Sequence, residues 1–425
     1  MNTQTIDGFL RKIRMHPDDT DMDSLVKAFL EEMNAGLEGK ESSLAMIPTY
    51  ISVGAGKPKP ESVIVLDAGG TNMRRALVTF GEGEPVISDF LAVPMPGSLK
   101  PITKDEFLTQ VAELIIPLAD RSRKVGFCFS YVTEIQPDRD GRLVAFCKEV
   151  EVYGSDGMLV GQSLKEKLAE MGAGDDFSFT ILNDTAACLM GGLARAGSTE
   201  HDGAAGLIIG TGTNTCYSEK GGNIGKLKNA ADMIINMESG CFDKALRGES
   251  DILFDAGTTI PGDHAFEKMF SGAYHGGVMT VTAGLAAREG LFSDKFRDAL
   301  ENSAGFEMPE IDEFLKAPRG EGRLAGLCAD ENDEETLRCI IDRSFERAAK
   351  LVCGNIAAVM LKCDGGVKAP FMVTADGSAF QKSLLFRPKL ERWVKEYIVN
   401  KLGRKVVFTE AADGNLLGAA LSAVQ

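Results

Sequence analysis

Two short segments of this chain resemble each other, and each joins an apolar strand to a tight turn. Residues 63–72 read VIVLDAGGTN, and residues 206–214 read GLIIGTGTN. Glycine permits positive φ and lets backbone N–H groups approach a ligand closely, and N–H groups beside threonine hydroxyls suit a phosphate chain. One such turn is more often only a hairpin. Two turns at corresponding points of successive α/β units instead favour two half-sites that face one another across a cleft and grip one nucleotide.

The composition is typical of a globular protein and disfavours nucleic acid and membranes as partners. The 425 residues are 44% hydrophobic and 25% charged, which allows two or three domains with a large core. The net charge of -16 repels phosphate backbones and anionic lipid. The N-terminus has no apolar signal segment, and the nine cysteines form no CxxC pair, which predicts a cytoplasmic protein with reduced thiols. The four histidines are isolated in the sequence, so no metal cluster is expected.

Apolar runs and helical periodicity alternate along the chain, which predicts an α/β fold. Helical periodicity covers about the first 45 residues, and residues 46–60 have the composition of a linker that leads to the first strand. The runs of residues expected as strands are 63–66, 76–79, 86–91, 125–130, 177–182, 371–374 and 405–410, besides the strand, turn and second strand that begin at residue 206. Helices are expected at 105–119, 184–195 and 414–424 and over most of 263–362. Residues 133–160 are rich in Gly and Asp and are expected to form hairpins and loops.

The turns carry candidate groups for phosphate chemistry, although neither is a known nucleotide fingerprint. The chain has no GxxxxGK[ST] motif, and neither turn is a GxGxxG sequence that leads into a helix. Asp67 ends the first strand, where its carboxylate could hold Mg²⁺ through water. A carboxylate that merely caps the turn explains Asp67 equally well.

A third segment, ILNDTAAC at 181–188, lies between the two turns. A strand delivers Asn183 and Asp184 to its carboxyl end, and a helix begins there. The carboxylate of Asp184 could accept the proton of an alcohol as a phosphoryl group arrives. A helix N-cap is the commoner role of such a residue. The residues alone leave both roles open.

Eight segments together resemble the hexokinase family, within the actin-like ATPase superfold. In chain order they are DAGGTNMRR, FCFS, LNDTAA, GTGTN, NMESG, FEKMFSGAY, TADGS and DGNLLGAAL. The resemblance runs from about Val63 to the C-terminus and is weak over residues 284–344 and over the first 60. It implies an α/β fold with two actin-like (ribonuclease H-like) lobes and a cleft between them. Residues 62–188 with the C-terminal helix 414–425 would form the small lobe, residues 189–413 the large lobe, and residues 1–61 an N-terminal helix and linker that pack on the large lobe.

The resemblance assigns roles to individual residues. Asp184 matches the catalytic base. The positions that match hexose-binding residues are Ser130, Lys148, Asn183, Asp184, Asn214, Glu238 and Glu267. The positions that match ATP-binding residues are Asp67, Gly69, Gly70, Thr71, Asn72, Arg74, Gly210, Thr211, Gly212, Thr213, Asp376, Gly377, Ser378 and Gly414, with Asp67 also expected to hold Mg²⁺ through water. Outside the matched segments, Glu267 would read as an exposed helix residue, Lys148 as a loop charge and Ser130 as a strand cap.

Four departures from the family pattern surround the expected sugar site. Tyr131 and Val132 follow Ser130 where the family usually has Pro, and Cys147–Lys148–Glu149–Val150 stands where the family has Thr-Lys-Gly-Phe. Ser239 replaces a common Trp, and Gly277 replaces a typical acid. The phosphate turns show no such departure. The pattern therefore favours kinase chemistry and leaves the preferred hexose open.

The implied activity is that of a hexokinase, which transfers the γ-phosphoryl group of Mg-ATP to the 6-hydroxyl of a hexose in the first step of glycolysis. Glucose is the first expectation, with mannose and fructose as others. The alternatives are a kinase for another sugar on the same fold, a non-catalytic ATP or sugar sensor, and a filament protein. The expected partners are a hexose and ATP, without nucleic acid or membrane, for a monomer or homodimer. The pattern leaves open the oligomeric state, other phosphoryl donors, product inhibition and the role of residues 284–344.

Overall fold

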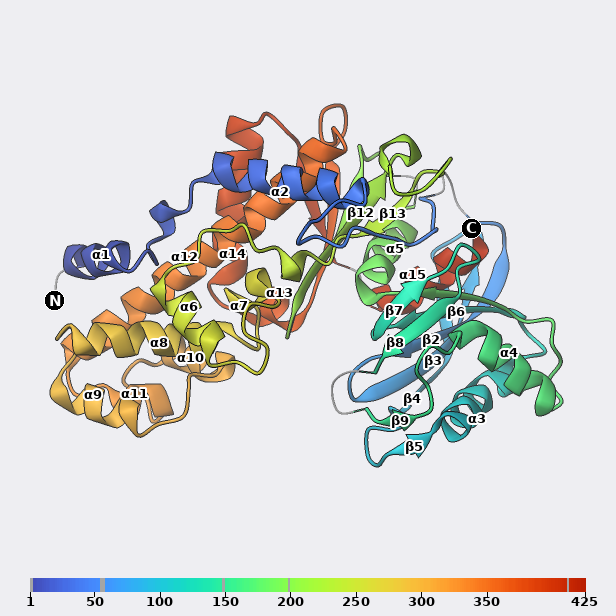
Figure 1. Cartoon of the computed structure of the whole chain (residues 1–425), viewed down its shortest axis with the longest axis horizontal. Coiled ribbons are helices and arrows are strands. Elements are labelled where there is room, and N and C mark those ends of the chain that lie inside the picture. The colour runs from blue at the N-terminus through green and yellow to red at the C-terminus, as the bar shows by residue number, and fades with distance from the viewer. Residues whose placement is uncertain (1–2, 54–57, 147–149, 198, 411–412) are drawn as a thin grey trace.

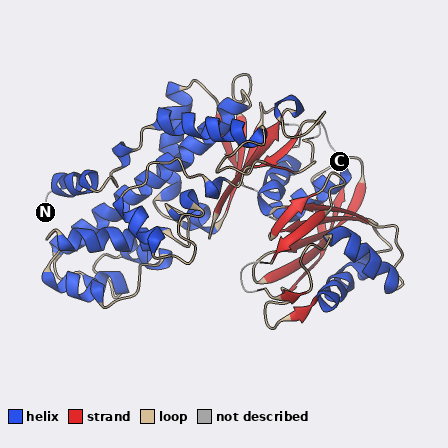
Figure 2. Ribbon diagram, in the orientation of Figure 1, coloured by secondary structure: helices blue, strands red, loops and turns tan. Residues whose placement is uncertain are grey.

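The computed structural model describes residues 3–53, 58–146, 150–197, 199–410 and 413–425. It consists of two lobes, each built around one mixed β-sheet (Figures 1 and 2). In the small lobe, helices lie beside the sheet. In the large lobe, most of the chain outside the sheet is helical, and the N-terminal helix lies at the far end of that lobe (Figure 1).

The sheet of the small lobe has five strands in the order β10-β6-β2-β3-β4. β2 (Glu61–Ala68) and β3 (Asn72–Phe80) form an antiparallel hairpin, and β4 (Val86–Pro94) continues it. β6 (Lys124–Phe129) pairs in parallel with β2, and β10 (Ser178–Leu182) pairs in parallel with β6. β2 is buried from Val63 onward because its side chains are covered on both faces, as its apolar run predicts.

The sheet of the large lobe repeats this arrangement. Its order is β1-β13-β12-β11-β14-β15. β11 (Ala204–Ile209) and β12 (Thr213–Glu219) form the antiparallel hairpin, and β13 (Met233–Asn236) and the short β1 (Ile47–Pro48) extend it. β14 (Phe371–Asp376) and β15 (Val406–Thr409) pair in parallel on the other side of β11. The repeated strand–turn segment of the sequence is therefore the central hairpin of each sheet.

Two helices of small residues lie between the sheets. α5 (Asp184–Ala196) packs against β11, β12 and β14 of the large lobe, whereas α15 (Gly414–Val424) packs against β2, β6 and β10 of the small lobe (Figure 1). The two helices touch through their backbones, since a Cβ at Gly191 would lie 2.2 Å from the carbonyl oxygen of Gly414. A Cβ at Gly418 would lie 1.8 Å from that of Ala187. Small side chains thus allow the contact that joins the two lobes.

The outer helices of the small lobe pack on its apolar core. α3 (Lys104–Ile115) begins at a capping box in which Thr103 accepts from the N–H of Glu106, and the carboxylate of Glu106 accepts from Thr103. α3 packs against α4 (Val160–Glu170). The segment expected to form hairpins and loops contains β7 (Val132–Ile135) and β8 (Gly141–Ala145), which pair with each other. β9 (Val152–Tyr153) pairs with β5 (Ile102–Thr103).

The large lobe is covered by helices, and the N-terminal helices pack among them. α2 (Met22–Leu37) and α1 (Thr3–Lys12) contact the long α12 (Glu331–Lys362), and the ring of Phe29 on α2 stacks on that of Phe242 at 3.7 Å. The other α-helices of this lobe are α6 (Glu249–Ala256), α7 (Ala265–Lys268), α8 (His275–Arg288), α9 (Asp294–Glu301), α10 (Met308–Lys316), α11 (Arg323–Leu327), α13 (Ser378–Lys382) and α14 (Phe386–Trp393). Short 3₁₀ turns are η1 (Pro17–Asp19), η2 (Ile116–Leu118), η3 (Gly221–Asn223) and η4 (Ser239–Cys241), and η5 (Val394–Lys401) is a π-helix. Within the described ranges, no helix combines the length and apolar character needed to cross a bilayer.

Candidate active site

The two glycine turns close the central hairpins in a similar way. The N–H of Gly69 donates to the carbonyl of Asn72 over 3.2 Å, and the N–H of Gly210 donates to the carbonyl of Gly212 over 2.9 Å. Each turn presents an exposed threonine, Thr71 in the small lobe and Thr211 in the large lobe. Each lobe therefore offers one exposed Gly-Thr turn at the end of its central strand.

Asp67 is a buried carboxylate at the base of the first turn. It is only 4% exposed, and Nη1 of the exposed Arg74 lies 3.1 Å from its Oδ2. Burial raises the pKa of Asp67, whereas the Arg74 guanidinium lowers it. The hydroxyl of Tyr131 donates to the carbonyl of Gly69 over 2.6 Å and fixes the other side of the turn. The first turn is thus held by a charged contact and by a side chain that follows Ser130.

The ADGS segment lies directly against the second turn. Gly377 has φ +113°, and a Cβ there would meet the carbonyl carbon and oxygen of Ile209 at 2.4 Å and the nitrogen of Gly210 at 2.7 Å. Asp376 accepts from the N–H of Gly377 and from Nε2 of Gln381. Only glycine fits this approach of two backbones, so the turn after β14 and the turn between β11 and β12 form one surface.

Asp184 lies between the two halves of the site. It is the first residue of α5, and Asn183 caps the helix by accepting from the N–H of Thr185 over 2.8 Å. The N-cap of α5 is therefore Asn183, and the interpretation of Asp184 as the N-cap is wrong. The negative charge of Asp184 contributes to the raised pKa of Asp67 in the small lobe and to that of Glu238 in the large lobe. The Asp184 carboxylate thus lies close enough to affect the pKa of one carboxyl group in each lobe.

An amide and carboxylate network lies on the large-lobe side. Nδ2 of Asn214 donates to Oδ1 of Asn236 over 2.7 Å, and Nδ2 of Asn236 donates to Oε1 of Glu238 over 2.6 Å. Oδ1 of Asn214 accepts from the N–H groups of Thr215 and Ser239. The side-chain amides of Asn214 and Asn236 therefore fix the orientation of the Glu238 carboxylate.

Glu267 joins this network to the second turn. Its Oε2 accepts from the N–H of Thr213 over 2.8 Å, and a Cβ at Gly212 would lie 2.4 Å from that oxygen. The side chain is partly buried and faces the turn, so Glu267 is not the exposed helix residue that its local sequence would suggest. Burial is the main cause of the raised pKa of Glu267. Burial also raises the pKa of Glu238, and the carboxylates of Asp184 and Glu267 add to this effect.

The remaining predicted residues divide between the two lobes. Ser130 lies beside the first turn, where its N–H donates to the carbonyl of Ala68 over 3.3 Å. Gly414 is buried against α5, and Ser378 is exposed at the start of α13. Lys148 lies outside the described residues. The predicted positions that surround the two turns are Asp67, Gly69, Gly70, Thr71, Asn72 and Arg74 in the small lobe, and Gly210, Thr211, Gly212, Thr213, Asp376 and Gly377 in the large lobe.

Two residues of the site were missed by the sequence reading. Asn236 connects Asn214 to Glu238, and Tyr131 holds the carbonyl of Gly69. Asn236 was visible as the first residue of the NMESG segment. Tyr131 appeared only as a departure from the family pattern. Its bond to a turn more than fifty residues earlier in the chain has no local signal in the sequence.

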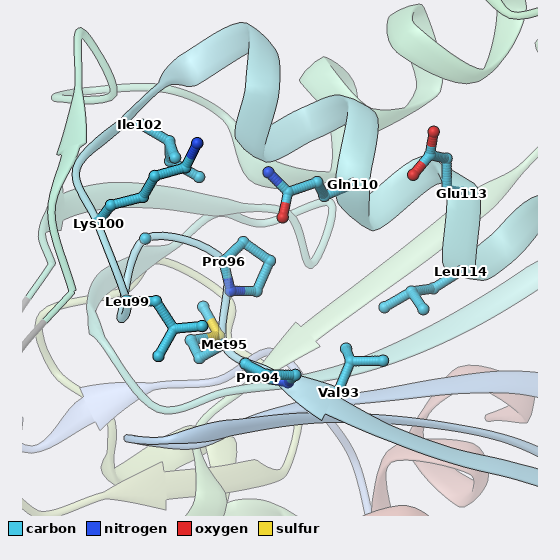
Figure 3. A pocket seen from close by; sticks show the side chains of 11 residues that line it. Val93, Pro94, Met95, Pro96, Leu99, Lys100, Ile102, Gln110, Glu113 and Leu114 are labelled. Carbon is cyan, nitrogen blue, oxygen red and sulfur yellow. The ribbon is translucent and has the colours of Figure 1, made fainter.

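A separate apolar pocket lies on the small lobe. It has a volume of about 340 Å³ between the end of β4 and α3, and Figure 3 shows Pro94, Pro96 and Leu99 on one side and Gln110 and Leu114 on the other. None of the residues predicted to bind hexose or ATP lines it. The pocket is therefore not part of the candidate active site.

Comparisons with known proteins identify the family of the chain. Two family models, both described as hexokinase, match residues 6–193 and 204–425. Hexokinase-1 of Schizosaccharomyces pombe is 29% identical and covers 92% of this chain and 85% of its own length. The chloroplastic Hexokinase-2 of Nicotiana tabacum is 28% identical, with coverage of 93% and 85%.

Solved structures share the fold. A hexokinase from Schistosoma mansoni complexed with glucose superposes with a TM-score of 0.74 at 21% identity, over 100% of both chains. A second hexokinase crystal structure has a TM-score of 0.76 at 19% identity, over 100% of this chain and 96% of its own. The predicted fold of two actin-like lobes is confirmed. Since one family model alone matches more than half of the chain and the other matches most of the rest, this chain belongs to the hexokinase family.

Proposed function

We propose that the chain transfers the γ-phosphoryl group of Mg-ATP to the 6-hydroxyl of a hexose, with Asp184 as the general base. The hexokinase family supplies the reaction class. Glucose is the first expected acceptor, because a structure with the same fold holds glucose. One observation supports the assignment of the base: Asp184 is the first residue of α5, which Asn183 caps and which packs against both α15 and β11, so its carboxylate stands where the two lobes meet.

The large-lobe network is suited to a polyhydroxyl ligand. A sugar hydroxyl both donates and accepts, and Glu238 and Glu267 offer acceptors whereas Asn183 and Asn214 offer both kinds of group. The amide contacts hold Glu238 in place before a ligand arrives. A site built in this way rejects an analogue that lacks one hydroxyl, because a buried polar group is then left without a partner.

Asp184 would orient the 6-hydroxyl and accept its proton. The N-terminal end of α5 and the cap by Asn183 fix the carboxylate. Proton removal as the phosphoryl group arrives is worth about 10²-fold or more in rate.

The residues of the two turns fit a metal–nucleotide complex. Asp67 is a buried oxygen donor of the kind that Mg²⁺ prefers, and it would hold the ion through water. Thr71 and Thr211 are exposed, so their hydroxyls and N–H groups suit phosphate oxygens, and Gly377 would close on the adenosine side. When bound, the metal ion neutralises charge on the transferred group.

The test is a coupled ADP-release assay with Mg-ATP and glucose, mannose, fructose, N-acetylglucosamine or no sugar. Release that depends on a hexose is expected, with the sugar of highest kcat/KM identifying the substrate. Equal ADP release with and without sugar would instead support the sensor or ATPase reading, which the family match disfavours.

We also propose boundaries for the two lobes, a cellular compartment and an oligomeric state. Residues 62–188 with 414–425 would move as one lobe against residues 189–413, with residues 1–61 carried by the larger one. We expect a cytoplasmic protein that is a monomer or homodimer, although one relative is chloroplastic. Analytical ultracentrifugation with and without hexose tests the oligomeric state.

Replacing Glu238 by glutamine is expected to raise the hexose KM by roughly 10- to 100-fold while also raising the Tm. A hydrogen bond to a charged group is worth about 1.5–3 kcal/mol, and about 1.4 kcal/mol corresponds to tenfold in affinity. Glutamine keeps an oxygen for the donor of Asn236, so the network below stays intact. Steady-state kinetics and thermal unfolding measure the two effects.

The expected gain in stability follows from the sign of the pKa shift. Because the folded-state pKa of Glu238 is raised, the folded state binds that proton more tightly than the unfolded state. The stabilising contribution is therefore present at low pH and is lost as the pH rises through the raised pKa. At neutral pH the ionised carboxylate of Glu238 lowers the free energy of unfolding, and the uncharged amide of glutamine removes this destabilisation. The exposed Glu335, changed to glutamine, is the control and should alter neither value. A lower Tm without a change in KM would show that Glu238 is purely structural.

A further inference from the structure

A thiol, a carboxylate and an imidazole converge beside the proposed hexose site. The ligand atoms of Cys241, Asp263 and His264 all lie within 4.8 Å of one another. Nδ1 of His264 lies 3.1 Å from a carboxylate oxygen of Asp263, is shielded from solvent and makes no hydrogen bond within the described part of the chain. We propose that these three side chains form a binding site for Zn²⁺ that regulates hexose binding.

Two packed segments bring the ligands together. Cys241 ends η4, and its N–H donates to the carbonyl of Glu238 over 3.0 Å. His264 directly precedes α7, which packs against η4. A Cβ at Gly240 would lie only 3.2 Å from Oε2 of Glu267. The ligands are therefore presented by backbone that is already in contact, so little ordering is needed when a metal binds.

The ligand set selects the metal. A thiolate and an imidazole are poor ligands for Mg²⁺, which prefers oxygen, whereas Zn²⁺ binds sulfur, nitrogen and carboxylate oxygen together. Three protein ligands leave one tetrahedral position for water or another group. Because Mg²⁺ prefers oxygen ligands, the Mg²⁺ used for catalysis should not occupy this site. The separation of Cys241 from His264 in the sequence explains why the sequence alone predicted no cluster.

The site adjoins both carboxylates that we assign to the hexose, and this step rests on the proposed function. The N–H of Cys241 donates to the carbonyl of Glu238 over 3.0 Å, and Gly240 beside it packs against the carboxylate of Glu267. A bound divalent cation adds positive charge beside these two acceptors and favours their contact with the cation over contact with sugar hydroxyls. Bound Zn²⁺ is therefore expected to compete with the hexose and not with Mg-ATP.

The first test measures metal binding alone and does not depend on catalysis. The reduced full-length protein is titrated with Co²⁺ as a spectroscopic probe, and Zn²⁺ is then added. A thiolate-to-cobalt charge-transfer band that Zn²⁺ removes is expected in the wild type and in Cys339→Ala, whose half-buried thiol lies on α12. Cys241→Ser should abolish the band, and His264→Gln, which removes one of the three ligands, should weaken metal affinity strongly. No band in the wild type, or an unchanged band in Cys241→Ser, would overturn the proposal.

The second test links the site to the reaction. In the coupled assay, Zn²⁺ is expected to raise the hexose KM at least several-fold without changing kcat, and a chelator should reverse the effect. Cys241→Ser should lose this sensitivity, whereas Cys339→Ala should keep it. Inhibition of equal strength in Cys241→Ser would refute the regulatory role. If the protein lacks hexose-dependent turnover without Zn²⁺, the proposed function fails, and the cobalt spectrum still decides whether the metal site exists.

Discussion

Replacement of Asp184 by alanine is expected to lower kcat for hexose phosphorylation by about 10²-fold or more, because general-base catalysis contributes at least that much. The fold should persist. Asn183, and not Asp184, caps α5, and removal of Asp184 also relieves its repulsion with Asp67 and Glu238. Turnover in the coupled assay and the thermal unfolding curve measure the two expectations.

Two further variants separate the loss of a base from the loss of a charge at a helix start. Asp184→Asn keeps the shape but cannot accept a proton, so its kcat should fall as far as that of Asp184→Ala. Asp294 is likewise the first residue of a helix, α9, and Asp294→Ala removes the same N-terminal charge away from the site. This control should retain full turnover. A kcat of Asp184→Ala within tenfold of the wild type would remove Asp184 from the role of base.

The repeated hairpin is the part of the fold that was best predicted from the sequence. The strand before each turn contains an apolar run, residues 63–66 in β2 and the whole of β11, which is typical of a central strand covered on both faces. Gly69 and Gly210 mark the turns in the sequence, although neither has the positive φ that glycine permits and a Cβ at either position would make only ordinary contacts at 3.7 Å or more. The strands and turns therefore needed only local information, and the observed sheets confirm them.

The connections across the site could not be predicted in the same way. β13 is a four-residue strand that completes the second sheet, and its apolar run is too short to be distinguished from a loop. Asn236 stands at its end and orients Glu238, so a missed strand became a missed site residue. The contact of Glu267 with the second turn arises from tertiary packing and leaves no periodic signal.

The sequence also does not show whether Asn183 or Asp184 caps α5. Asn183 and Asp184 are both good helix-capping residues, and their order alone does not show which side chain turns back to the helix. The structure resolves this, since the amide of Asn183 accepts from Thr185. The carboxylate of Asp184, one residue later, accepts from the hydroxyl of Thr185 over 3.3 Å, and its role as the base stays a prediction.

Replacement of Gly377 by alanine is expected to raise the Kd for Mg-ATP by about 10-fold or more and to leave hexose affinity unchanged. Its φ of +113° with ψ of 150° lies in a region that is essentially restricted to glycine, at a cost of about 1–3 kcal/mol for other residues. The new Cβ would also meet the backbone of Ile209 at 2.4 Å, and neither backbone can yield without moving the second turn. Isothermal titration with Mg-ATP and with hexose separates the two affinities.

A matched control isolates the contact from the backbone strain. Gly290 also has positive φ, at +74°, but nothing lies within 4 Å of a Cβ there. Gly290→Ala therefore carries strain without a collision and should leave both affinities unchanged. If Gly377→Ala binds Mg-ATP within twofold of the wild type, the surface formed by the two turns is not the nucleotide site. If it weakens hexose binding equally, the second turn acts mainly through Glu267, because Thr213 and Glu267 share a hydrogen bond.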